Sequence, residues 1–155
     1  MKTIYLAGGC FWGCQKYFDL LPGVCGTEVG YANGPIAHPS YEQVKAHAGH
    51  AETVKVDYDP AVLPLQTLLE KYFAVIDPTA VNHQGEDTGI QYRTGIYYTQ
   101  IEDAPVIDEA LRALAARYDQ PLAVEHQPLE NFYPAEEYHQ KYLEKHPDGY
   151  CHIHF

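Results

Sequence analysis

The order of the predicted elements, strand-helix-strand-strand-helix-strand, indicates an α+β fold. We expect a split βαβ (ferredoxin-like) two-layer sandwich with a mainly antiparallel sheet, extra helices and a long C-terminal coil. Two patterns support this expectation. Residues 53–58 (TVKVDY) alternate apolar and polar side chains with a period of two, which is typical of a strand. Residues 65–76 repeat apolar side chains at the i, i+3, i+4 spacing of a helix face.

The remaining elements complete this order. Further strands are predicted over residues 3–8, 24–32 and 94–99, with an edge strand over 122–126. Helices are predicted over 11–20, 103–118 and 135–145, with a short one within 40–47. The polar segment 77–93 is too long for a simple connection, which indicates a functional loop. At 155 residues without an internal repeat, we expect a single domain spanning 1–155.

Charge and apolar content narrow the classes of function. The formal net charge of -11 argues against binding to nucleic acid or to an anionic membrane. No apolar stretch approaches the length of a transmembrane helix, and the apolar stretch after Lys2 is too short for a secretory signal. We therefore expect a cytoplasmic protein whose four cysteines are reduced thiols.

The segment GGCFWGCQKYF (residues 8–18) places Cys10 between two glycines and a predicted helix. A cysteine at a helix start faces unpaired backbone N–H groups and the positive end of the helix dipole, which stabilise the thiolate and lower the thiol pKa. From this pattern alone, a reactive thiol and a small buried side chain are about equally favoured. Phe11 and Trp12 could likewise line an apolar pocket or belong to the core.

A metal site is the main alternative for the thiols. Nine His and four Cys invite it, and the chain carries Cys-His-Ile-His near its end. However, the sequence has no C-x-x-C pair, and Cys10-x3-Cys14 lacks a second matching pair. We predict neither a metal nor a cofactor. A metal- or redox-sensing binding protein and a different thiol oxidoreductase, such as a peroxidase, remain alternatives.

A set of motifs along the whole chain resembles the A-type peptide methionine sulfoxide reductases. In order, these are GGCFWG (8–13), LPGV (21–24), VGYANG (29–34), YEQV (41–44), GHAE (49–52), VDYDP (56–60), DPT (77–79), QGEDTGIQYR (84–93) and FYPAEEYHQKYL…HPDGYC (132–151). The resemblance implies an enzyme of protein repair after oxidative damage. It would use a thiol to reduce methionine S-sulfoxide, free or in proteins, to methionine.

The same resemblance implies roles for particular residues. Cys10 matches the cysteine that attacks the sulfoxide sulfur and becomes a sulfenic acid, and Glu52 matches the acid that supplies a proton. Tyr41 and Tyr92 match the hydroxyls that hold the sulfoxide oxygen. Asp87 matches a residue that organises the site, and Phe11 and Trp12 match the pocket for the substrate methyl group.

The other three cysteines are candidates for the second thiol. By the resemblance, Cys151 is the resolving cysteine, and its disulfide with Cys10 would be recycled by thioredoxin or a similar dithiol. Cys14 lies one helical turn beyond Cys10, so we expect packing first and a second resolving thiol as the alternative. Cys25 falls on a predicted strand, where we expect a core position, with a shuttle thiol as the lesser alternative.

Overall fold

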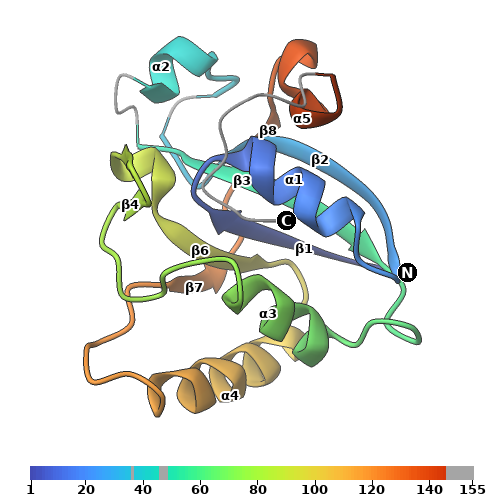
Figure 1. Cartoon of the computed structure of the whole chain (residues 1–155). Coiled ribbons are helices and arrows are strands. Elements are labelled where there is room, and N and C mark those ends of the chain that lie inside the picture. Colours follow the sequence, from blue (N-terminus) through green and yellow to red (C-terminus); the bar gives the residue numbers. More distant parts are fainter. Residues whose placement is uncertain (36, 46–48, 146–155) are drawn as a thin grey trace.

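A six-stranded sheet forms the centre of the computed structural model (Figure 1). The structure describes residues 1–35, 37–45 and 49–145. The strand order is β7-β6-β1-β3-β2-β8. The strands are β1 (Lys2–Gly8), β2 (Val24–Ala32), β3 (Ala51–Tyr58), β6 (Thr94–Tyr98), β7 (Glu125–Pro128) and β8 (Phe132–Pro134). A separate two-stranded sheet joins β4 (His83–Gln84) to β5 (Asp87–Thr88) inside the long polar segment.

The first four α-helices occur in the predicted order along the chain. They are α1 (Phe11–Asp19), α2 (Tyr41–Lys45), α3 (Leu65–Phe73), α4 (Ala104–Ala115) and α5 (Tyr142–Lys145), with short 3-10 turns η1 (Ile90–Tyr92), η2 (Ile101–Asp103) and η3 (Glu137–His139). In α2, Ser40 and Gln43 each bond the other's backbone N–H through their side chains, so a capping box starts this short helix.

The prediction of a ferredoxin-like sandwich with a mainly antiparallel sheet is wrong. The sheet is mixed, because β7 pairs with β6 in parallel from Gly95↔Glu125 to Tyr98↔Pro128, and the fold is α/β. A parallel pair needs a long crossover between its strands, and α4 lies in that connection. The sequence predicted the helix over 103–118 as an added element, whereas it is the link that sets this strand direction.

The predicted helix over 135–145 is also wrong. The segment instead forms η3 and α5, separated by an extended Gln140 and by Lys141 in the left-handed region (φ 56). β8, which precedes it, was not predicted. The helical pattern fails here because the side chain of Gln140 and the backbone of Lys141 bond to β2 and α1 instead of continuing a helix.

The core lies where α1 and α3 cover the sheet. Val54 and Val56 of β3 are fully buried, as the alternating pattern predicted. Phe18 of α1 meets Tyr72 of α3 with their ring centroids 6.5 Å apart. The predicted apolar face of α3 is buried along the helix at Leu65, Leu68, Leu69, Tyr72 and Phe73. Figure 1 shows α1 lying across the strands, with α3 and α4 beside it toward one edge.

A clamp made by Gln140 and Lys141 holds the C-terminal segment on this core. The Val29 N–H donates to Gln140 Oε1 (3.0 Å), and Gln140 Nε2 donates back to the Val29 carbonyl (2.9 Å). The Lys141 N–H donates to Gln15 Oε1 (2.7 Å), and the Lys141 ammonium pairs with Asp19. A side-chain amide therefore takes the place of a neighbouring strand at Val29.

The Gln140→Ala variant should be less stable than the native chain. Because the change leaves the Val29 N–H without its acceptor, while the Val29 carbonyl keeps the Ala135 N–H at 2.9 Å, we expect the free energy of unfolding to fall by about 1–3 kcal/mol. Urea denaturation monitored by circular dichroism measures this difference. The exposed Gln120 provides the control, and an equal loss for Gln120→Ala and Gln140→Ala would contradict the clamp.

Candidate functional site

Cys10 lies at the junction of β1 and α1. β1 ends at Gly8, Gly9 adopts a positive φ of 90°, and Cys10 is the residue before the first helical turn. The left-handed conformation favours glycine at position 9, which explains part of the Gly-Gly-Cys motif. Cys10 is 7% exposed, so its thiol is almost covered by the surrounding side chains.

Glu52 enters the same region from β3. It lies opposite Tyr31 of β2, and its side chain is 2% exposed. Its Oε1 accepts the backbone N–H of Phe11 at 3.2 Å, which ties β3 to the first turn of α1. Burial raises the pKa of the Glu52 carboxyl to about 8, although the Phe11 N–H opposes this shift. The carboxyl is therefore mostly protonated at neutral pH and can act as an acid.

The prediction of a lowered pKa for Cys10 is wrong for this structure. Burial raises the pKa of the thiol well above its ordinary value, and the nearby Glu52 carboxylate raises it further. The backbone N–H of Trp12 lowers it, as expected at a helix start, but does not outweigh the burial. The site at neutral pH therefore holds a protonated thiol beside a mostly protonated carboxyl.

Two tyrosine hydroxyls belong to the same cluster. Tyr41 lies on α2 and Tyr92 on η1, and Glu52 and Cys10 interact electrostatically with both. Burial and then Glu52 raise the pKa of Tyr41 to about 12 and shift that of Tyr92 upward as well. Both phenols therefore stay protonated and can donate hydrogen bonds to an oxygen.

Asp87, on β5, is the fifth group that the structure brings near the thiol. Burial, followed by the neighbouring Glu86, raises the pKa of its carboxyl. Asp87 in turn raises the pKa of Cys10, Glu52 and Tyr92. Cys10, Glu52, Tyr41, Tyr92 and Asp87 thus come from five separate segments and meet in one place.

The two aromatic residues after Cys10 have different environments. Phe11 is buried, with its ring centroid 5.7 Å from that of Tyr31. Trp12 is half-buried and stacks on Tyr142 of α5 at 3.8 Å between ring centroids. Both rings also contact His139, at 5.4 Å and 5.7 Å. Phe11, Trp12 and His139 form one aromatic wall that starts at the residue after Cys10, and Tyr142 extends it from the C-terminal segment.

The sequence did not single out His139 or Glu136, which connect this wall to α2. Trp12 Nε1 donates to His139 Nδ1 at 3.0 Å, and the His139 ring lies 4.5 Å from that of Tyr41. Glu136 accepts the backbone N–H of Tyr41 at 3.3 Å. Both residues fall in the motif FYPAEEYHQKYL, which was the available signal, but sequence separations near 100 residues hid their partners.

The two other cysteines in the described part of the chain lie in different settings. Cys14 is buried in the core, and its thiol donates to the Gly8 carbonyl at 3.2 Å. Cys25 is exposed, so the expectation of a core position is wrong; it lies at an irregularity of β2 between Val24 and Gly26. From there to Tyr31, which pairs with Glu52, the strand spans about 20 Å. Cys151 lies outside the described residues.

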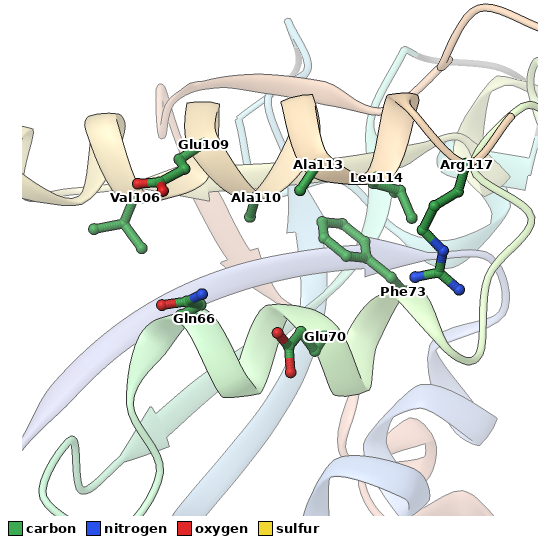
Figure 2. Close-up of a pocket in the computed structure, with 9 residues that line it drawn as sticks. All are labelled: Gln66, Glu70, Phe73, Val106, Glu109, Ala110, Ala113, Leu114 and Arg117. Atoms are coloured by element: carbon green, nitrogen blue, oxygen red, sulfur yellow. The ribbon is translucent and has the colours of Figure 1, made fainter.

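Other kinds of site receive no support from the described part of the chain. It contains no group of three or more His, Cys, Asp or Glu side chains placed to hold a metal ion. Among residues 1–35, 37–45 and 49–145, no helix is both long and apolar enough to cross a bilayer. A groove of about 220 Å³ between α3 and α4 is lined by Gln66, Glu70, Phe73, Val106, Glu109, Ala110, Ala113, Leu114 and Arg117 (Figure 2). None of the predicted site residues lies in it.

A thiol beside a protonated carboxyl and two phenol donors has the groups that a thiol-dependent reductase needs, namely a nucleophile, an acid and donors for a leaving oxygen. The comparison with known sequences identifies the family. The family described as "Peptide methionine sulfoxide reductase" matches residues 2–155. The chain therefore belongs to the peptide methionine sulfoxide reductases.

Individual relatives agree with this assignment. The chain is 59% identical to the peptide methionine sulfoxide reductase MsrA of Lachnoclostridium phytofermentans, over 98% of this chain and 92% of that one. It is 51% identical to MsrA of Mycoplasma genitalium, over 100% and 99% of the two chains.

Solved structures show the same similarity. Mxr1 of Saccharomyces cerevisiae in its reduced form matches with a TM-score of 0.94 and 35% identity, over 99% of this chain and 91% of that one. Mxr1 in complex with Trx2 matches with a TM-score of 0.67 and 27% identity, over 99% and 88% of the two chains. The present structure is thus more similar to the reduced form than to the complex.

Stability should depend on pH through Glu52. Because folding raises the pKa of this carboxyl from 4.5 to about 8, its contribution to stability is fully present below pH 4.5 and is lost as the pH rises toward 8. Glu52→Gln mimics the protonated side chain and removes this loss. The free energy of unfolding of the variant, relative to that of the native protein, should therefore rise by about 2–4 kcal/mol from pH 5 to pH 8.

Urea unfolding at a series of pH values measures this difference. Glu109→Gln, at an exposed carboxylate of α4, is the matched control and should not reproduce the gain. A difference between Glu52→Gln and the native protein that stays constant with pH would show that Glu52 titrates as an ordinary carboxylate.

Proposed function

We propose that this protein reduces methionine S-sulfoxide, free or in proteins, to methionine with Cys10 as the nucleophile. The observation that carries the proposal is the Cys10 thiol beside the buried carboxyl of Glu52, whose pKa of about 8 keeps it a proton donor. A sulfoxide oxygen is a poor leaving group unless it is protonated. An acid next to a thiol therefore answers the main chemical difficulty of the reaction.

The chemical step conserves atoms and electrons. Cys10 loses its proton and attacks the sulfoxide sulfur, while Glu52 and the hydroxyls of Tyr41 and Tyr92 hold and protonate the sulfoxide oxygen. The S–S bond formed by this attack and the sulfur–oxygen bond of the substrate both break as the protonated oxygen passes to Cys10 as a sulfenic acid and methionine leaves. The proton lost by Cys10 replaces the one that Glu52 gives to the oxygen, so a thiol and a sulfoxide become a sulfenic acid and a thioether. The sulfoxide is reduced by two electrons and Cys10 is oxidised by two. Asp87 orients these groups through its charge and its position on β5.

Specificity for one epimer requires separate places for the methyl group and the oxygen. In the proposal, Phe11 and Trp12 take the substrate methyl group, and the two tyrosines take the oxygen. Only one configuration at sulfur places both groups correctly while the sulfur faces Cys10. The aromatic wall formed by Phe11, Trp12 and His139 supports this part of the proposal.

The resolving step completes the proposed cycle. Cys151 attacks the Cys10 sulfenic acid, a disulfide forms and water leaves. A dithiol such as thioredoxin then reduces the disulfide. The solved complex of the relative Mxr1 with Trx2 supports this partner. Cys14, buried one turn beyond Cys10, is the second candidate for the resolving thiol.

The proposed function also bears on the domain organisation of the chain and on its cellular compartment. Residues 1–155 are proposed to form one reductase domain, which the family match over residues 2–155 supports. A cytoplasmic location is proposed because recycling by a dithiol needs a reducing compartment.

Cys10→Ser should abolish the reduction of the S epimer, since the hydroxyl cannot replace the thiolate as a nucleophile. Turnover is measured as methionine released from the two epimers of N-acetyl methionine sulfoxide with dithiothreitol. The native protein should act on the S epimer and leave the R epimer unchanged. Equal rates for both epimers, or a Cys10→Ser variant that still turns over, would refute the proposal.

The exposed Cys25 provides the matched control for this experiment. Cys25→Ser removes a thiol that lies at the other end of β2, so the rate with dithiothreitol should stay near that of the native protein. A loss equal to that of Cys10→Ser would mean that the assay reports general thiol damage.

Cys151→Ser should separate the two halves of the cycle. We expect about one methionine per enzyme in a single turnover without reductant, followed by poor recycling with thioredoxin. Peptide mapping of enzyme oxidised by one equivalent of substrate identifies the cysteine joined to Cys10. Unimpaired recycling, together with a Cys10–Cys14 disulfide, would move the resolving role to Cys14.

A further inference from the structure

A second hollow lies next to the candidate active site, between the loop before α2 and strand β8. Its volume is about 320 Å³, and it is open to solvent. We call it the α2–β8 hollow, and its lining residues are His38, Pro39, Ser40, Tyr133, Pro134 and Glu136. None of these residues is proposed to touch the methionine sulfoxide itself, although Glu136 holds the backbone of Tyr41.

The floor of the α2–β8 hollow is negatively charged. Burial alone would raise the pKa of Glu136, but hydrogen bonds from its own backbone N–H, the Tyr41 N–H and the Tyr31 hydroxyl outweigh it and hold the pKa below the ordinary value. Three neutral groups donate to the carboxylate, namely the Tyr31 hydroxyl at 3.1 Å and the Tyr41 N–H and the Tyr138 hydroxyl at 3.3 Å each.

No lysine or arginine in the described part of the chain forms an ion pair with this charge. The ion pairs formed there by lysine and arginine involve other carboxylates. Lys45, the basic residue of α2, lies 6.0 Å above the ring of Tyr41 instead. His139 interacts with the Glu136 charge electrostatically, but burial lowers the pKa of the His139 ring below its ordinary value and disfavours its charged form. A half-buried carboxylate without a cation, in an open hollow, is favourable for a positively charged group from outside.

An aromatic ring forms the wall beside this carboxylate. Tyr133 is half-buried, and the His38 ring packs edge-on against it at 4.8 Å between centroids. A cation within about 6 Å of a tyrosine face is attracted by the ring electrons. A carboxylate and a tyrosine ring in one hollow suit the long side chain of lysine or arginine, whose apolar stem packs on the ring while the charge reaches Glu136.

The α2–β8 hollow adjoins the backbone of Tyr41, because Glu136, which lines the hollow, accepts the Tyr41 N–H at 3.3 Å. Ser40 lines the hollow, and the next residue, Tyr41, interacts with Cys10 and is proposed to hold the sulfoxide oxygen. Neighbouring residues of an extended peptide are about 3.3 Å apart. A lysine or arginine one or two positions from a bound methionine sulfoxide is therefore about 3–7 Å along the peptide from it, and its long side chain extends this reach toward the hollow.

We propose that the α2–β8 hollow binds a lysine or arginine side chain that flanks methionine sulfoxide in a protein substrate. This inference rests on the proposed function and adds to it a preference for basic sequence around the oxidised methionine. Glu136 supplies the charge, and Tyr133 supplies the ring.

Blocked peptides with one methionine S-sulfoxide test the preference. Lysine, glutamine or glutamate is placed in turn at each of the two positions on either side of the sulfoxide, and kcat/KM is measured for each peptide. At one position, lysine should exceed glutamine by about 3- to 10-fold, and glutamate should fall below glutamine. The lysine preference should shrink as salt rises from about 0.1 M to about 1 M.

Two variants of the hollow and one control assign the preference to these residues. In Glu136→Gln the lysine-to-glutamine ratio should fall to about 1, and in Tyr133→Leu it should fall partway. Ratios are compared because Glu136 also holds the backbone of Tyr41, so that absolute rates change. Glu137→Gln removes the same charge from a neighbouring side chain that is 91% exposed and outside the hollow. This control should keep the ratio of the native protein.

The outcomes separate the two proposals. If N-acetyl methionine S-sulfoxide is reduced but lysine, glutamine and glutamate peptides react equally, the α2–β8 hollow does not bind a basic side chain. An undiminished ratio in Glu136→Gln, or an equal fall in Glu137→Gln, would also overturn the inference. If no S-sulfoxide is reduced at all, the proposed function itself fails.

Discussion

The hydrogen bond from the Phe11 N–H to the buried carboxyl of Glu52 is the contact on which the candidate site depends. It joins the first turn of α1 to β3 and keeps an acidic group beside the thiol of Cys10. Because burial favours the protonated, neutral forms of both groups, charge develops in the site only when a substrate is present to receive the proton. In the proposed reaction, the sulfoxide oxygen is the group that receives the proton, which links activation of the nucleophile to binding of the right substrate.

The C-terminal segment holds the two sides of this site together. Glu136 bonds the backbone of Tyr41, His139 bonds the ring of Trp12, and Gln140 takes a strand position beside Val29. These contacts all come from residues 136–140 and join α2, α1 and β2. The segment thereby places the wall for the substrate methyl group, the hydroxyl for the substrate oxygen and the α2–β8 hollow at fixed distances from one another.

The periodic spacing of apolar residues in the sequence correctly predicted strands and helices that bury one face. The strand over 53–58, which lies within β3, and the apolar face of α3 are confirmed, because burial on one face leaves a period of two or 3.6 in the chain. The helix over 135–145 is wrong because bonds to Gln15 and Val29 outweigh local helix preference. The parallel direction of β7 is set by the crossover through α4, which no local pattern contains.

The sequence by itself determined the family and the identity of the candidate residues, because motifs such as GGCFWG and GHAE retain specific residues in order along the chain. The tertiary structure alone decided their chemical state. The pKa of Cys10 rises instead of falling, and Cys25 lies on the surface instead of in the core. The α2–β8 hollow likewise exists only where segments about 100 residues apart meet. Burial and charge at each group depend on distant neighbours, and the order of residues along a chain does not state which neighbours those are.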